Sequence, residues 1–131
     1  MRRTNKLKQI VAKQNKPSTF VIFNPANITY LSGFQGARAL LVPEDGQSVL
    51  YVPGVNCEQA KEEAKDFAVE LIERGENLME KIAKQTSAKK LCVDTLSIEN
   101  WRMLAKAVGG EENLELANDL IKGMRNIKSQ Q

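Results

Sequence analysis

Residues 38–53 read RALLVPEDGQSVLYVP and contain two short apolar runs separated by a turn sequence. The runs Arg38 to Pro43 and Ser48 to Pro53 are rich in Leu, Val and Tyr, and apolar runs of this length bounded by turn residues are typical of buried strands. Gly46 in the intervening EDGQ can adopt the positive φ that a tight reversal of the chain requires. The pattern predicts a β-hairpin and therefore a sheet with antiparallel neighbours.

Strand and helix patterns alternate on either side of this hairpin. The run TFVIF at 19–23 is almost wholly apolar, which is typical of a strand in the middle of a layered α/β sheet. Further strands are predicted at 66–72, 89–94 and 113–116, and helices at 5–14, 55–64, 77–85, 97–108 and 118–128. The chain is therefore expected to form an α/β domain with a mixed sheet of five or six strands flanked by helices.

The stretch NPANITYLSGF at 24–34 fits neither a strand nor a helix pattern. Pro25 disfavours helical backbone in the residue before it, and Asn, Ser and Gly favour tight, hydrogen-bonded loops. The stretch is therefore predicted to be a loop, with two possible roles. It could close the end of the sheet, with Tyr30 and Phe34 as apolar caps and Asn27 satisfying buried backbone groups. It could instead be presented to a partner or ligand.

The residue types that carry most chemistry are scarce. The chain has no histidine, which excludes a Ser-His nucleophile and the commonest metal ligand. GFQG at 33–36 precedes a strand and lacks the third glycine of a dinucleotide-binding loop. Most acids fall on the outer faces of predicted helices. Asp94 ends a predicted central strand, but alone it is expected to form a turn or to cap the helix that begins near Ser97. No catalytic residue and no metal ligand is predicted.

The charge distribution is uneven. Residues 1–43 contain seven basic side chains and no acidic one, namely Arg2, Arg3, Lys6, Lys8, Lys13, Lys16 and Arg38. Leu7, Ile10 and Val11 recur at helical spacing among the N-terminal cations. These cations are therefore expected to form the solvated face of a helix and not a nucleic-acid-binding arm. No apolar run approaches the roughly 20 residues that span a bilayer, and no signal peptide is visible. A soluble, cytoplasmic protein without nucleic-acid or membrane partners is expected, with Cys57 and Cys92 as sheltered thiols.

Several motifs occur in an order that resembles a known family. NITYLSGF at 27–34, ALLVP with EDG at 39–46, and RNIKS at 125–129 are similar to the N-terminal domain of the creatinase, prolidase and Xaa-Pro aminopeptidase family. The resemblance covers essentially the whole chain. It implies that 1–131 is a single domain, with a mixed sheet of about six strands and ribonuclease-H-like topology, which ends at the junction to an absent catalytic domain.

The resemblance implies a noncatalytic role. In the family, hydrolysis belongs to a C-terminal catalytic domain with two divalent metals, often manganese or cobalt, so no cofactor is expected in this segment. The implied partners are a second subunit in a homodimer, the catalytic domain of the same polypeptide, and short proline-containing peptides. The implied function is support of dimerisation and shaping of the substrate entrance of a metal-dependent Xaa-Pro dipeptidase or aminopeptidase.

The resemblance also implies site residues. Asn27, Tyr30, Phe34 and Arg38 would belong to a substrate-entrance or dimer loop, and Arg38 resembles an arginine that meets a substrate carboxylate from the neighbouring subunit in the creatinase branch. A plain surface arginine at the start of a strand is the alternative for Arg38. The sequence departs from the family at 53–57, PGVNC, where many members have an Arg-Tyr pair.

Two other functions stay open for the whole chain. It could be a stand-alone ligand- or protein-binding module of the same fold without peptidase activity. A nuclease with the related sheet topology would need acids on the first strand, and the run at 19–23 has none.

Overall fold

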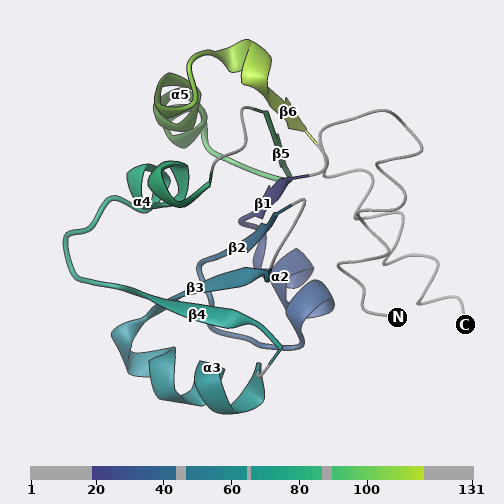
Figure 1. Cartoon of the computed structure of the whole chain (residues 1–131), viewed down its shortest axis with the longest axis vertical. Helices are drawn as coiled ribbons and strands as arrows, with labels where there is room; N and C mark the ends of the chain where they lie inside the picture. Colours follow the sequence, from purple (N-terminus) through teal and green to yellow (C-terminus); the bar gives the residue numbers. More distant parts are fainter. Residues whose placement is uncertain (1–18, 44–46, 65, 87–89, 117–131) are drawn as a thin grey trace, which may run out of the picture.

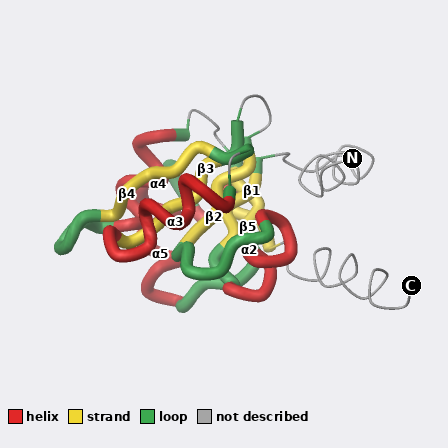
Figure 2. Tube along the Cα trace, turned by 90° about the horizontal axis from the view of Figure 1, so that it is seen from below, coloured by secondary structure: helices red, strands yellow, loops and turns green. Residues whose placement is uncertain are grey.

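The computed structural model describes residues 19–43, 47–64, 66–86 and 90–116. These residues form a six-stranded sheet in the order β4-β3-β2-β1-β5-β6, with helices on both sides (Figures 1 and 2). The strands are β1 (Phe20–Ile22), β2 (Ala39–Val42), β3 (Val49–Pro53), β4 (Ala68–Ile72), β5 (Leu91–Val93) and β6 (Leu114–Leu116). The helices are α2 (Pro25–Ser32), α3 (Cys57–Glu63), α4 (Leu78–Gln85) and α5 (Ile98–Ala107), with short 3₁₀ turns η1 (Gly54–Asn56) and η2 (Glu111–Asn113).

The sheet is mixed, as predicted. β2 pairs antiparallel with β3, with Ala39 opposite Tyr51, which confirms the predicted hairpin. β1 also pairs antiparallel with β2, whereas β1 with β5, β3 with β4, and β5 with β6 are parallel pairs. The turn at 44–46 and the predicted helices at 5–14 and 118–128 lie outside the described residues.

The two faces of the sheet are covered by different helices. Successive strand residues point to opposite faces, so Val21 packs on one side while Phe20 and Ile22 pack on the other. Ile28 and Leu31 of α2 share a buried cluster with Phe20, whereas Val21 packs with residues of α4 and α5. Figure 1 shows α4 and α5 together on one side of the sheet and α2 on the other. The central strands are therefore buried on both faces, which explains their uninterrupted apolar sequence.

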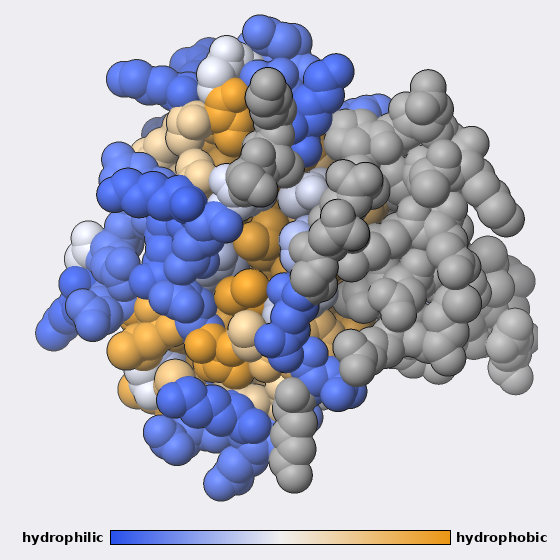
Figure 3. All heavy atoms as spheres, in the orientation of Figure 1, coloured by the Kyte–Doolittle hydropathy of each residue, from blue (hydrophilic) through white to orange (hydrophobic). Residues whose placement is uncertain are grey.

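Local capping defines the helices that cross between parallel strands. The Asn77 side chain accepts a hydrogen bond from the Glu80 backbone N–H at the start of α4, and Ser97 does the same for Asn100 in α5. Met79 and Ile82 of α4 are buried, as the helical spacing predicts. In the face shown in Figure 3, hydrophobic residues appear as patches between hydrophilic residues. No helix of the described segments is long and apolar enough to cross a membrane.

The prediction of a loop at 24–34 is wrong, because residues 25–32 form α2. Asn24 has extended backbone, and its Oδ1 accepts hydrogen bonds from the Ala26 and Asn27 N–H groups at 2.9 and 3.3 Å. Pro25 stands in the first turn, where a missing N–H costs nothing. Gly33 has φ 78° and donates its N–H to Thr29 O, which ends the helix. The Asn-Pro step thus starts a helix here.

Candidate functional site

The Asp94 carboxylate joins the end of β5 to the start of α2. Its Oδ1 accepts hydrogen bonds from the backbone N–H groups of Phe23 and Thr95, at 2.8 and 2.6 Å. Its Oδ2 accepts from the Asn24 N–H and from Asn27 Nδ2, both at 2.9 Å. The Asp94 side chain is buried, so water does not solvate the carboxylate. The four N–H donors take the place of water as its hydrogen-bond partners.

This arrangement corrects the expectation that Asp94 caps the helix near Ser97. Ser97 itself provides that cap, whereas Asp94 holds a segment about 70 residues earlier in the chain. Each carboxylate oxygen already accepts two hydrogen bonds, so Asp94 has no free position for a metal ion. Within the described ranges, no group of three or more His, Cys, Asp or Glu side chains could hold a metal. The described residues therefore do not fit a two-metal centre.

The segment that follows α2, residues 33–38, is fixed by hydrogen bonds along its length. The Ser32 hydroxyl donates to Ile28 O at 2.7 Å and accepts from the Phe34 N–H at 3.1 Å. Asn56 Nδ2 of η1 donates to Gly36 O at 3.1 Å, and the Arg38 N–H donates to Tyr51 O at 2.8 Å. These hydrogen bonds fix the position of residues 33–38 between α2 and the hairpin, and we call this segment the rim.

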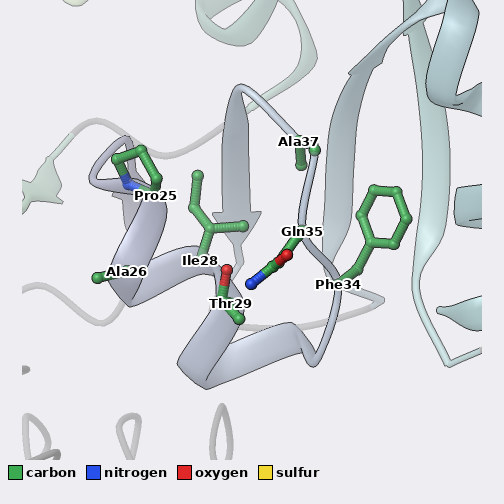
Figure 4. A pocket seen from close by; sticks show the side chains of 8 residues that line it. Pro25, Ala26, Ile28, Thr29, Phe34, Gln35 and Ala37 are labelled. Atoms are coloured by element: carbon green, nitrogen blue, oxygen red, sulfur yellow. The ribbon is translucent and has the colours of Figure 1, made fainter.

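A groove lies between α2 and this rim (Figure 4). Its volume is about 460 Å³, within the range of small-molecule sites. Its walls are mostly apolar, and Thr29 and Gln35 supply the polar side chains. Figure 4 shows Gln35 extending back toward α2 and Phe34 pointing away from it. A small, largely apolar group that needs few hydrogen bonds matches this lining.

The structure separates the four predicted site residues into two pairs. Asn27 and Phe34 are almost fully buried, with relative exposures of 0% and 1%. Their side chains pack inside the domain and help to fix the positions of α2 and of the rim. Tyr30 is half-buried against the cluster on that face, and Arg38 is exposed. Tyr30 and Arg38 are therefore the members of the set that offer side-chain surface to another molecule.

Arg38 lines a second cavity, of about 310 Å³, beyond the ends of β3 and β4. On its wall the Glu76 carboxylate accepts a hydrogen bond from the Glu73 N–H at 2.7 Å and pairs with Lys81 Nζ at 3.0 Å. The Glu73 backbone N–H and the Lys81 ammonium hold the pKa of the Glu76 carboxyl below its ordinary value. Lys81 also lies 3.5 Å from Glu70.

The sequence patterns did not predict Asn56 or Arg74, which support or line these two cavities. Asn56 stands 20 residues after its partner Gly36, and Arg74 follows a different strand from Arg38. Local patterns carry no signal for such pairs. The departure from the family at 53–57 did mark the segment that contains Asn56.

Comparison with known proteins gives consistent matches. The Creatinase/Prolidase N-terminal domain family matches residues 3–127. An uncharacterized peptidase of Staphylococcus epidermidis is 25% identical over 135 residues, which cover 99% of this chain and 38% of that protein. The chain thus spans little more than a third of the length of the curated relatives that it matches.

Solved structures agree with the sequence matches. The N-terminal domain of cytoplasmic peptidase PepQ from Mycobacterium tuberculosis is 30% identical with a TM-score of 0.75, covering 93% of this chain and 97% of that one. A proline dipeptidase structure from Streptococcus pneumoniae has a TM-score of 0.81 at 23% identity, over 97% of this chain and 99% of that one, and shows the shared fold. Because the family match covers residues 3–127, nearly the whole chain, the chain belongs to the creatinase/prolidase N-terminal domain family.

Proposed function

We propose that this chain is the noncatalytic N-terminal domain of a metal-dependent Xaa-Pro dipeptidase or aminopeptidase, in which it supports a homodimer and shapes the substrate entrance. The observation that carries the proposal is the family match over residues 3–127. It is supported by relatives that are named as a peptidase, as the N-terminal domain of a peptidase, and as a domain of a dipeptidase. A cytoplasmic location is part of the proposal, since the relative from M. tuberculosis is named a cytoplasmic peptidase.

The structure supports a scaffolding role through the rim at 33–38. A rim held at Phe34, Gly36 and Arg38 by hydrogen bonds keeps a fixed shape, as a substrate entrance requires. Fixed walls exclude long peptides by collision and admit short ones. The exposed Arg38 guanidinium can form a paired hydrogen bond with a peptide carboxylate and so orient the peptide.

The proposal assigns bond cleavage to a separate catalytic domain, in which two divalent ions, manganese or cobalt, would supply the activated water. The residues of this chain contribute shape, orientation and association. Short proline-containing peptides are the proposed substrates.

The first test is an assay of the isolated chain with an Xaa-Pro dipeptide and added Mn²⁺. No turnover above a metal-only blank is expected, because both Asp94 carboxylate oxygens already accept hydrogen bonds and the described residues contain no cluster of three or more His, Cys, Asp or Glu side chains that could hold a metal. Measurable turnover by the chain alone would overturn the proposal.

The second test uses the polypeptide that joins this chain to a catalytic domain. Replacing Arg38 by Ala is expected to raise KM several-fold for a dipeptide with a free carboxylate, with little change in kcat or in melting temperature. Arg102→Ala, an exposed arginine of α5, serves as the control. A complete reading frame that encodes no Asp, His and Glu metal ligands would favour a stand-alone binding module instead.

A further inference from the structure

The backbone at Gly36, in the middle of the rim, is enclosed by two side chains. Gly36 has φ 115°, and its carbonyl oxygen accepts a hydrogen bond from Asn56 Nδ2 at 3.1 Å. A Cβ at this position would lie 2.8 Å from Asn56 Nδ2 and 3.5 Å from Cζ of the buried Phe34 ring. The rim therefore passes between Asn56 and Phe34 at a place that suits glycine and no larger residue.

The two ends of the rim are held differently from its middle. At one end the Phe34 N–H donates to the Ser32 hydroxyl, and at the other the Arg38 N–H donates to a backbone oxygen of β3. Among the described residues, Asn56 is the one outside the rim that forms a hydrogen bond with 35–37. Asn56 belongs to η1, which directly follows β3. The middle of the rim therefore depends on the Asn56 side chain.

Asn56 affects the groove between α2 and the rim without facing it. Gly36 and Ala37 line this groove of about 460 Å³, whereas Asn56 is among the lining residues of neither this groove nor the cavity beyond β3 and β4. Without the Asn56 amide, the Gly36 peptide could turn, because glycine adopts many backbone conformations. Loss of this one hydrogen bond would therefore move the groove wall while the chemistry of every lining residue stays the same.

We propose that Asn56 is a positioning residue that determines which peptides the entrance admits, because it fixes Gly36 and with it the wall of the groove. The inference rests on the proposed function, since it takes the rim as part of a substrate entrance. A wall that is fixed at Gly36 obstructs a peptide that extends past the proline, and a wall that is released there yields to it. Asn56 stands in the segment 53–57, where the sequence departs from the family, so its role is inferred from this structure alone.

The test uses the polypeptide that joins this chain to a catalytic domain, with glycyl-proline and glycyl-prolyl-glycine as substrates. Asn56→Asp keeps the size of the side chain but removes its N–H donors. It should lower the ratio of kcat/KM for the dipeptide to kcat/KM for the tripeptide about fivefold, the effect expected for one hydrogen bond. Asn56→Gln keeps an amide donor and should retain part of this ratio.

Asn113→Asp is the matched control. Asn113 is half-buried like Asn56, and its Nδ2 also donates to a backbone oxygen, that of Val108, at 2.8 Å. It directly precedes β6, at the other end of the sheet from β3 and β4. This variant should lower the melting temperature about as much as Asn56→Asp does, and it should leave the substrate ratio unchanged.

A second measurement uses the isolated ¹⁵N-labelled chain. In NMR relaxation experiments, Asn56→Asp should increase the mobility of the backbone at 35–37, and Asn113→Asp should not. Three results would overturn the inference: an unchanged substrate ratio in Asn56→Asp, an equal change in Asn113→Asp, or a backbone at 35–37 as rigid in Asn56→Asp as in the wild type. A wild-type joined polypeptide that hydrolyses neither peptide would instead refute the proposed function, and this inference with it.

Discussion

At the scale of single residues, the Asp94 carboxylate connects parts of the chain that are distant in sequence. Its donors Phe23 and Asn24 lie 71 and 70 residues away, and Asn27 lies 67 residues away. Hydrogen bonds to a charged acceptor each contribute about 1.5 to 3 kcal/mol, and donors left buried without a partner cost about as much. The position of the start of α2 therefore depends on the Asp94 side chain, which directly follows β5. The position of the rim at 33–38 depends on it through α2.

Replacement of Asp94 by Ala is expected to lower the free energy of unfolding by about 3 to 5 kcal/mol, because four donors lose their acceptor. Asp94→Asn keeps an acceptor for some of them and should cost less. Urea denaturation followed by circular dichroism measures both values. Glu62→Ala, an exposed change in α3, is the control and should lie within about 0.5 kcal/mol of the wild type. A loss below about 1 kcal/mol for Asp94→Ala would show that the carboxylate does not hold the two segments together.

Gly36 and Gly33 provide a second, matched comparison at this scale. Both have positive φ, 115° and 78°. A Cβ at Gly36 would lie 2.8 Å from Asn56 Nδ2, whereas a Cβ at Gly33 would meet nothing within 4 Å. Gly33→Ala should therefore cost about 1 to 2 kcal/mol from backbone strain alone. Gly36→Ala should cost more, and Asn56→Ala in the same chain should recover part of the difference. Equal losses at the two glycines, measured by urea denaturation, would contradict the packing of η1 against the rim.

At the scale of elements, α2 is a short helix stabilised by its ends. The Asn24 side chain satisfies the Ala26 and Asn27 N–H groups, and Gly33 closes the other end. Ile28 and Leu31 attach the helix to the sheet. An eight-residue helix is not stable alone in water, so capping and packing decide whether it forms.

Asn24→Ala should lower the free energy of unfolding by about 1 kcal/mol, the usual loss on removal of an N-cap side chain. Asn24→Ser keeps an acceptor at the cap and should lose less than half of that. Ser97→Ala removes the corresponding cap of α5 and provides a matched comparison of similar size. If alanine and serine at position 24 were equally stable in thermal and urea denaturation, the cap would contribute nothing to α2.

At the scale of the whole molecule, one sheet carries two cores. Ile28 of α2 belongs to the cluster on one face, and Ile82 of α4 to the cluster on the other. Because adjacent residues of the same strand serve both clusters, neither face can lose its packing without disturbing the strands of the other. The described domain is therefore expected to unfold as one cooperative unit.

Ile28→Ala and Ile82→Ala test this expectation, since each should cost about 2 to 5 kcal/mol. Trp101, the one tryptophan of the chain, packs with the cluster that contains Ile82. Its fluorescence should nevertheless report the same shifted midpoint for Ile28→Ala as circular dichroism does. Separate midpoints from the two probes in that variant would show that the two faces unfold independently.

The strand and helix patterns were sufficient to predict most of this architecture. Apolar runs predicted all six strands, and the EDGQ turn sequence predicted the antiparallel hairpin. The Asn-Pro start and the Gly33 end of α2 were also local signals, but proline was interpreted as a break and not as the first residue of a helix. These features depend on near neighbours in the chain, so the sequence by itself determined them.

Only the tertiary structure decided where the predicted site residues lie and which groups they contact. It buries Asn27 and Phe34, exposes Arg38, and gives Asp94 to α2 instead of to the helix that follows it. It also brings Arg38 and Arg74 to one cavity. The physical reason is that these outcomes depend on the order of strands in the sheet. Strand order places residues 20 to 70 positions apart within hydrogen-bonding distance, and no local spacing encodes it.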